Sequence, residues 1–230
     1  RFTLTMLFAC LMAGAFSQAP FPTEAEMDQF FNGKTYVVLE NSPFSIYNSV
    51  IKKVVEEYWT VTDYEFIDFT RFEQIRTDPA FSFIILTQTT YSNDRSSAVY
   101  NFINLLVGKD VRSMDDMPEM IAIPLSYKNI GEETYTYKLN MIVQFMQQHA
   151  LAIREDPSKT GMQFLKYYNK NVPQLKEKTL LINKADLAPD LQGEDLSKIY
   201  PHPLKVVEEA EIVEAIENGT STLSFELILR

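Results

Sequence analysis

One order of secondary-structure elements occurs twice along the chain, and this repetition constrains the fold more than any other feature. Residues 34–40 (KTYVVLE) form a β-branched and aromatic run with the length of a strand buried in a parallel sheet. An amphipathic helix follows, then a second strand at residues 64–69, a short helix, and a longer strand at residues 81–91. Parallel strands need crossover connections, so this β-α-β-α-β order predicts an α/β fold with a mainly parallel sheet.

The same order returns about 140 to 144 residues later, which we interpret as an internal duplication. KTLLIN (178–183) corresponds to KTYVVL, LKVVE (204–208) to YEFID, and LSFELIL (223–229) to FSFIIL. Residues 196–200 stand where the first helix of the unit is expected, and EIVEAIE (211–217) stands for the second. The sequence leaves open whether the two units share one sheet or form two.

Capping residues and apolar spacing place the helices of the first unit. Thr23, with Glu26 three residues later, forms a capping-box pattern that predicts a helix over residues 23–31. Residues 42–59 are expected to form the next helix, and Thr70 is expected to cap a short one. The apolar stripe of the longer helix is expected at Ile46, Val50, Val54 and Tyr58.

The segment between the two units has a different pattern. The turn-rich residues 92–97 (SNDRSS) predict a β-hairpin that adds a strand at residues 98–107. Residues 120–126 are expected to form a further strand, and Pro124 favours a sheet edge or the end of that strand. Residues 132–154 are expected to form one long helix, whose apolar stripe is a candidate for docking on a partner.

Residues 1–17 have the layout of a secretory signal. Residues 4–16 are apolar and too short to span a bilayer, and small residues follow, so we expect cleavage before Gln18. Cys10 lies in a sequence that resembles a lipobox, which leaves lipid attachment as an alternative. The expected domains are the signal at residues 1–17, the first α/β unit with the hairpin extension and long helix at 18–156, and the second α/β unit at 157–230.

The composition of an exported chain excludes several kinds of site and partner. Removing the signal removes Cys10, the single cysteine, so we expect no disulfide, cysteine nucleophile or thiolate metal site. It also removes Arg1, which leaves 20 basic against 31 acidic side chains and argues against nucleic acid as a partner. No later segment has transmembrane length. The start at Arg1 and the strand pattern that runs to Arg230 predict that both ends of the sequence are cut and that the second unit is truncated.

The string Asn183-Lys184-Ala185-Asp186 resembles the guanine-recognition motif of GTPases. Its position after an apolar strand is explained by the repeated unit, whose first copy carries VVLENSP at the same place. The chain contains no G-x-x-x-x-G-K-[ST] sequence to hold the phosphates on backbone N–H groups. We therefore expect no GTP binding.

The sequence contains few candidate catalytic side chains. His149 is expected to be a partly buried structural residue, because no metal-ligand spacing accompanies it. His202, between Pro201 and Pro203, is expected in a rigid turn, where contact with a ligand is an alternative. No G-x-S-x-G sequence is present, and the acidic residues 115–119 lack the glycine-bearing pattern of a calcium loop. We predict no catalytic residues, no metal site and no cofactor.

The element order over residues 34–86 resembles the amino-terminal domain of TolB and related envelope α/β modules, which act in periplasmic assemblies. The resemblance rests on element order and carries no functional residue across. The export signal, the duplication, the long amphipathic helix and the lack of catalytic patterns favour a periplasmic or extracellular, non-enzymatic protein that acts as a binding or accessory component of a cell-envelope assembly.

Two other functions remain as alternatives. The first is binding of a small ligand or glycan in a crevice at the carboxyl ends of the parallel strands, where such sites occur in α/β folds. The second is a hydrolase that uses His202 or an acidic loop. The candidate ligand-binding residues are Glu40, Asn41, Ser42, Asn183, Asp186 and His202.

Overall fold

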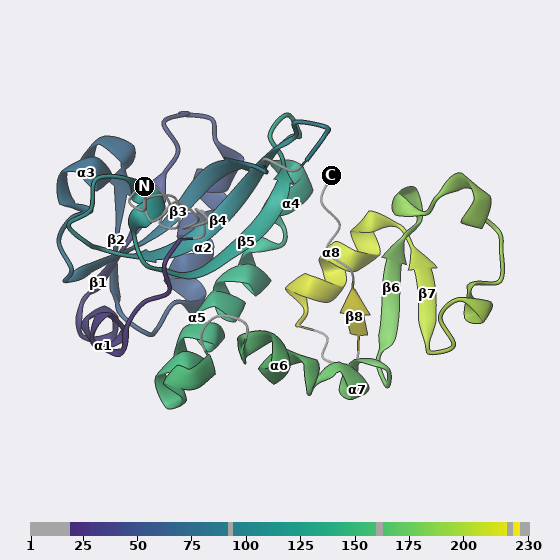
Figure 1. Cartoon of the computed structure of the whole chain (residues 1–230). Helices are drawn as coiled ribbons and strands as arrows, with labels where there is room; N and C mark the ends of the chain where they lie inside the picture. The colour runs from purple at the N-terminus through teal and green to yellow at the C-terminus, as the bar shows by residue number, and fades with distance from the viewer. Residues whose placement is uncertain (1–18, 92–93, 160–162, 220–222, 226–230) are drawn as a thin grey trace, which may run out of the picture.

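The structure is a computed structural model that describes residues 19–91, 94–159, 163–219 and 223–225. It is an α/β protein whose larger sheet has five strands in the order β2-β1-β3-β4-β5 (Figure 1). These strands are β1 (Lys34–Leu39), β2 (Asp63–Asp68), β3 (Phe81–Thr90), β4 (Val99–Val107) and β5 (Glu119–Tyr127). β1 is parallel to β2 and β3, and β4 is antiparallel to β3 and β5, so four strands point one way and β4 points the other.

Helices cover both faces of this sheet. Buried side chains of α2 (Ile46–Tyr58) and α5 (Leu139–Glu155) form one core with Val37 of β1, and α3 (Phe69–Ile75) forms the other core with Tyr36 and Val38. Successive residues of a strand point to opposite faces, so β1 contributes to both cores. This double coverage explains why the strand is an unbroken apolar run.

The capping box predicted at Thr23 is confirmed, because its hydroxyl accepts from the Glu26 main chain and Glu26 accepts from the Thr23 main chain. These bonds begin α1 (Glu24–Asn32). The edge position expected from Pro124 is also confirmed, because β5 is the last strand of the sheet.

The predicted stripe of α2 is confirmed at Val54, which is buried, and at Val50 and Tyr58, which are half-buried against the same core, but it is wrong at Ile46. The helix begins at Ile46, with Ser45 as N-cap, and Ile46 itself is 45% exposed. The start lies later than residue 42 because the hydroxyl of Ser45, and not Ser42, accepts from the main chain of Asn48. The side chains buried on α2 are Tyr47, Ile51, Val54 and Val55.

The single long helix predicted for residues 132–154 was also wrong. A short helix, α4 (Glu133–Thr136), is separated from α5 by two residues, Tyr137 and Lys138. The apolar stripe of α5 is buried in the core against α2 and the sheet, so it is not available for a partner. Its buried apolar members are Leu139, Ile142, Val143, Met146, Ala150 and Ile153.

A second, smaller sheet follows α6 (Gln163–Asn169) and α7 (Val172–Leu175). It has the order β7-β6-β8, and both pairs are parallel. Its strands are β6 (Thr179–Asn183), β7 (Leu204–Val207) and β8 (Leu223–Phe225), and α8 (Glu209–Glu217) lies between β7 and β8 in the chain. The two units therefore form two sheets, which lie side by side in Figure 1.

The β2-β1-β3 part of the first sheet and the β7-β6-β8 sheet have the same order and direction. Origin by duplication stays a prediction. The expected signal and Cys10 lie outside the described residues, as does most of the last expected strand. No helix among the described residues has the length and apolar character needed to cross a membrane.

Candidate functional site

Three of the expected ligand-binding residues lie together in the loop at the carboxyl end of β1. Glu40, Asn41 and Ser42 connect β1 to α2. The side chain of Asn48, in the first turn of α2, holds this loop by accepting from the Glu40 main-chain N–H and donating to the Glu40 carbonyl, both at 2.8 Å. The loop is therefore fixed by side-chain hydrogen bonds, and it lies where the chain leaves β1 toward β2 with β3 on the other side, the position at which α/β sheets bind ligands.

A carboxylate from a distant segment completes the start of α2. Glu132 accepts a hydrogen bond of 2.8 Å from the main-chain N–H of Tyr47 and bonds of 3.2 Å from the Ser45 hydroxyl. The first N–H groups of a helix have no partner within the helix, so a carboxylate stabilises them by hydrogen bonding and by its charge. Sequence patterns did not reveal this residue, since 87 positions separate it from Ser45.

One buried polar side chain near Glu132 lacks a hydrogen-bond partner. The hydroxyl of Tyr47 is fully buried and has no hydrogen-bond partner. Burial raises the pKa of Tyr47, and the negative charges of Glu40 and Glu132 contribute. Burial also raises the pKa of Glu40, as does the charge of Glu132. The carboxyl end of β1 thus combines the buried hydroxyl of Tyr47 with the half-buried carboxylate of Glu132 and the exposed carboxyl group of Glu40, which are groups that can form hydrogen bonds with a small polar ligand.

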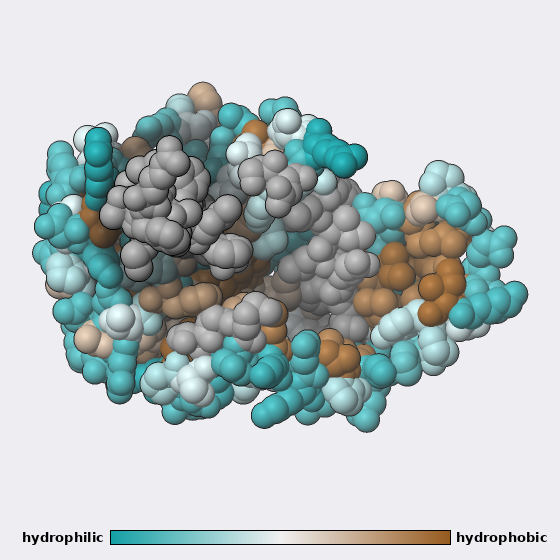
Figure 2. Space-filling view, viewed as in Figure 1, coloured by the Kyte–Doolittle hydropathy of each residue, from teal (hydrophilic) through white to brown (hydrophobic). Residues whose placement is uncertain are grey.

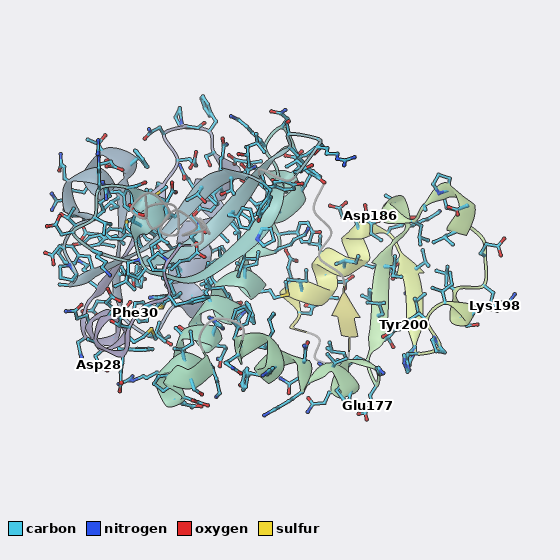
Figure 3. The ribbon with its side chains drawn as sticks, in the orientation of Figure 1. Asp28, Phe30, Glu177, Asp186, Lys198 and Tyr200 are labelled. Atoms are coloured by element: carbon cyan, nitrogen blue, oxygen red, sulfur yellow. The ribbon has the colours of Figure 1, made fainter. Side chains whose placement is uncertain are left out.

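The other three expected residues belong to the second sheet. Asn183, at the carboxyl end of β6, caps the 3-10 turn η3 (Lys184–Asp186) by accepting from the Ala185 main chain at 3.1 Å. His202 precedes the amino end of β7 and packs edge to face on Tyr200, 5.1 Å between ring centroids. Figure 3 shows Asp186 and Tyr200 toward opposite ends of these strands. The structure therefore does not bring the six residues into one crevice.

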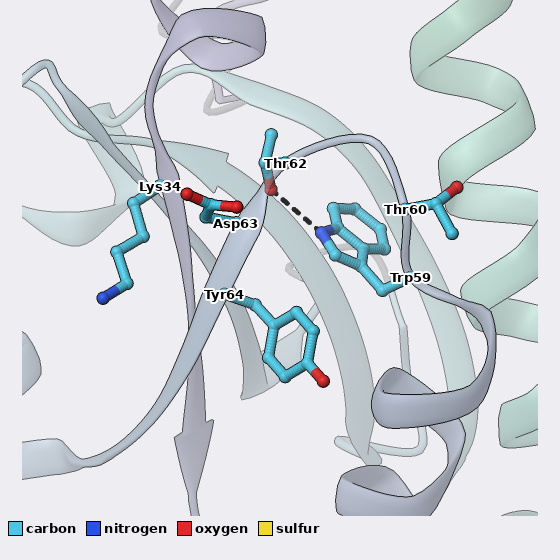
Figure 4. A pocket seen from close by; sticks show the side chains of 6 residues that line it. All are labelled: Lys34, Trp59, Thr60, Thr62, Asp63 and Tyr64. Atoms are coloured by element: carbon cyan, nitrogen blue, oxygen red, sulfur yellow. Dashed lines mark hydrogen bonds between the residues drawn. The ribbon is translucent and has the colours of Figure 1, made fainter.

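A cavity of about 520 Å³ lies at the opposite, amino-terminal edge of the first sheet (Figure 4). Its wall is rigid, because the indole N–H of Trp59 donates to the hydroxyl of Thr62 at 2.9 Å and that hydroxyl bonds Thr35 at 2.6 Å. It is lined by Lys34, Trp59, Thr60, Thr62, Asp63 and Tyr64. Lys34 forms an ion pair with Glu65 at 2.6 Å, so its charge is already compensated.

His149 is structural, as its surroundings show. Its ring is buried, and Nδ1 shares a hydrogen bond of 2.9 Å with the hydroxyl of Tyr168. Burial lowers the pKa of His149, and a hydrogen bond to the main chain at Met120 opposes that shift. The ring also packs edge to face on Phe164, 5.5 Å between centroids, so His149 joins α5 to β5 and α6.

One face of the second sheet is not covered by a helix among the described residues, and no sequence pattern indicated this. α8 packs on the other face, where its buried side chains join Leu181 and Val207 and Lys205 pairs with Glu211 at 2.6 Å. Paired residues of parallel strands share a face, so the pairs Leu180↔Leu204 and Ile182↔Val206 point away from α8. These four aliphatic residues, half-buried to exposed, are called the open face. Hydrophobic residues gather over β6 and β7 in Figure 2.

Within the described parts of the chain, no group of three or more His, Cys, Asp and Glu side chains is placed to hold a metal ion. Comparison of the chain with family models, with curated proteins and with solved structures gives no match. The resemblance in element order over residues 34–86 is thus not supported by a structural match.

Proposed function

We propose that the protein is an exported, non-enzymatic α/β protein that binds a protein partner as a component or accessory of a cell-envelope assembly. The observation that carries this proposal is the open face of the second sheet, where Val206 is 36% exposed. Parallel sheets are normally covered on both faces, because their strands are apolar on both. Contiguous apolar surface on a folded protein commonly marks an interaction site.

Support for export comes from the pattern of residues 1–17 and is tested separately. Fractionation of the source cells should recover the protein from the envelope or the medium. Mass spectrometry of the purified protein should give Gln18 as its first residue. If the protein is found in the cytosolic fraction and still carries residues 1–17, the proposal that it is exported is refuted.

Partner binding is tested by affinity purification of the full mature protein from envelope extract, with identification of the proteins that co-purify. The variant Val206→Asp places a charge on the open face and should abolish recovery of the specific partner. Phe44→Asp is the matched control, because Phe44 is 91% exposed and lies in the first unit. Equal recovery with both variants, each shown to be folded by circular dichroism, would contradict the proposal.

A second candidate function, binding of a small ligand or glycan at the carboxyl end of β1, is favoured by the unpartnered hydroxyl of Tyr47. Buried polar groups without partners cost free energy, and a ligand that supplies the missing hydrogen bond removes that cost. Calorimetric screening of soluble glycans should then find a ligand whose affinity falls in Tyr47→Phe, which keeps the ring and removes the hydroxyl. Unchanged affinity in that variant would place the ligand elsewhere.

A further inference from the structure

The first unit shows what normally covers a face like the open one. There the chain passes from β1 to β2 through α2, and from β2 to β3 through α3, and these two helices lie on opposite faces of the sheet. Right-handed crossovers produce this arrangement whenever successive connections run in opposite directions across a sheet. In the strand order β2-β1-β3 the two connections do run in opposite directions.

The second unit has the same strand order but lacks one of the two helices. The connection from β7 to β8 contains α8, which corresponds to α3. The connection from β6 to β7, residues 184–203, contains only the 3-10 turns η3, η4 (Pro189–Leu191) and η5 (Leu196–Lys198). Residues 196–200 stand where the repeat places a helix, and three of them form η5 instead. The open face is therefore the face on which a counterpart of α2 would lie.

The side chains of the open face suit a helix. α2 presents Tyr47, Ile51 and Val54 to its sheet, a spacing of three to four residues that keeps them on one side of the helix. The open face offers four aliphatic side chains from two neighbouring strands, paired Leu180↔Leu204 and Ile182↔Val206. A partner helix with apolar residues at the same spacing would bury these side chains as α2 buries those of β1.

The acidic residues near the open face favour a partner helix with positive charge. The connection between β6 and β7 carries exposed Asp190, Glu194 and Asp195 against exposed Lys184 and Lys198, and Lys184 already pairs with Glu208 at 3.4 Å. The connection also ends near exposed Ile199, which adds apolar surface. A helix that carries Lys or Arg along the flank next to this connection is favoured, since complementary charge guides association and disfavours other partners.

We propose that the open face binds an amphipathic helix of a protein partner, with aliphatic residues on one side and a basic flank, in the place that α2 occupies in the first unit. This inference rests on the proposed function and names the kind of segment that the site recognises. The mode of binding is a helix laid on an apolar surface, with anchors three to four residues apart.

Site-specific crosslinking tests the inference on the full mature chain. A photoreactive amino acid replaces Val206 in one variant and Lys53, on the exposed side of α2, in a control. After irradiation in envelope extract, the crosslinked peptides are sequenced. We expect the Val206 variant alone to capture a segment of another protein with apolar residues at helical spacing and flanking Lys or Arg.

The outcomes separate the inference from the proposed function. Capture of an extended, non-helical segment, or of a second copy of this chain, overturns the inference and leaves the proposal of a binding protein standing. Absence of any crosslink from Val206, with partner still recovered in affinity purification, overturns the inference because binding is then elsewhere. Absence of both crosslink and partner overturns the inference and the proposed function together.

A synthetic peptide with the captured sequence provides the second measurement. Its binding to the full chain should induce helical circular dichroism and weaken by about tenfold or more in Val206→Asp. Affinity should also fall in a variant with Asp190→Asn and Glu194→Gln, and the fall should be smaller at high salt because the charges lie at the surface. Binding without helix formation, or with equal affinity for Val206→Asp, would contradict the inference.

Discussion

Neighbouring aromatic residues in the first unit differ in their contribution to stability because they differ in burial. Phe72 has no exposed surface and packs edge to face on Phe83, 4.9 Å between ring centroids, whereas Phe69 is 43% exposed. We expect Phe72→Ala to lower the free energy of unfolding by about 3–5 kcal/mol, through lost burial and a cavity. Phe69→Ala on the same helix should lower the free energy of unfolding only slightly. Its cost should exceed that of a typical surface substitution by less than about 1 kcal/mol. Urea denaturation of both variants measures the difference, and similar costs would contradict it.

His149 makes stability depend on pH. Burial lowers its pKa in the folded state, so the unfolded chain takes up a proton first as the pH falls below about 6.5. Stability that is present above this pH is therefore lost as the pH falls toward the folded-state pKa. Glu40 and Glu119, whose pKa values burial raises, act in the opposite direction, because they favour the folded state at low pH.

The contribution of His149 is isolated by comparing the chain with His149→Gln in urea denaturation between about pH 5 and pH 7.5. The variant loses the hydrogen bond to Tyr168 and should be less stable throughout. The gap between the two proteins should narrow as the pH falls, since only the parent then loses stability through this residue. A constant gap would show that His149 does not titrate differently in the two states.

At the scale of single elements, the start of α2 depends on a residue outside the helix. Removal of the Glu132 carboxylate leaves the main-chain N–H of Tyr47 and the hydroxyl of Ser45 without this acceptor. We expect Glu132→Ala to lower the free energy of unfolding by about 1–2 kcal/mol, the usual cost of losing a helix cap. Glu133→Ala is the control, because Glu133 is exposed, and it should have little effect in thermal denaturation.

Strands and capping boxes were predictable because their signals are local. β1 and β6 follow from apolar runs, and α1 follows from Thr23 and Glu26. The burial of Tyr47 in place of Ile46 was not predictable, since both residues are apolar and the first turn of α2 is bonded to the distant Glu132. The break between α4 and α5 was not predictable either, because the sequence has no proline or glycine there.

The candidate site was predictable only in part, for a reason that concerns distance along the chain. Placement of Glu40 beside the start of α2 follows from strand and helix order, but the approach of Glu132 depends on tertiary packing. Asn183 and Glu40 were grouped because both follow a first strand, and the structure places those strands in different sheets. Strand order within a sheet can be argued from crossovers, whereas the number of sheets depends on packing that pattern alone does not encode.

At the scale of the whole molecule, the two units have cores of very different size. The second core consists of Leu181, Val207, Ile212, Ala215 and Ile216, with Tyr137 and Met141 of the first unit packed against it. The first unit has two larger cores, one on each face of its sheet. The second unit therefore depends on the first for part of its burial.

We expect a fragment of residues 19–156 to unfold cooperatively and a fragment of residues 157–230 not to fold alone, because its small core cannot offset the loss of chain entropy. Circular dichroism during heating checks both fragments. A cooperative transition in the second fragment would show that its core is sufficient without Tyr137 and Met141.

The missing crossover helix also affects how the backbone of the second sheet exchanges its hydrogens with water. β6 is bonded on both sides, to β7 and β8, yet side chains of a helix shield it from one face only. Its amide hydrogens should exchange through small local opening events. The amide hydrogens of β1, which is shielded on both faces, should exchange only through larger opening events. Occupation of the open face would then slow exchange in β6 and β7 and leave β1 unchanged, so that the backbone itself records when the surface is filled.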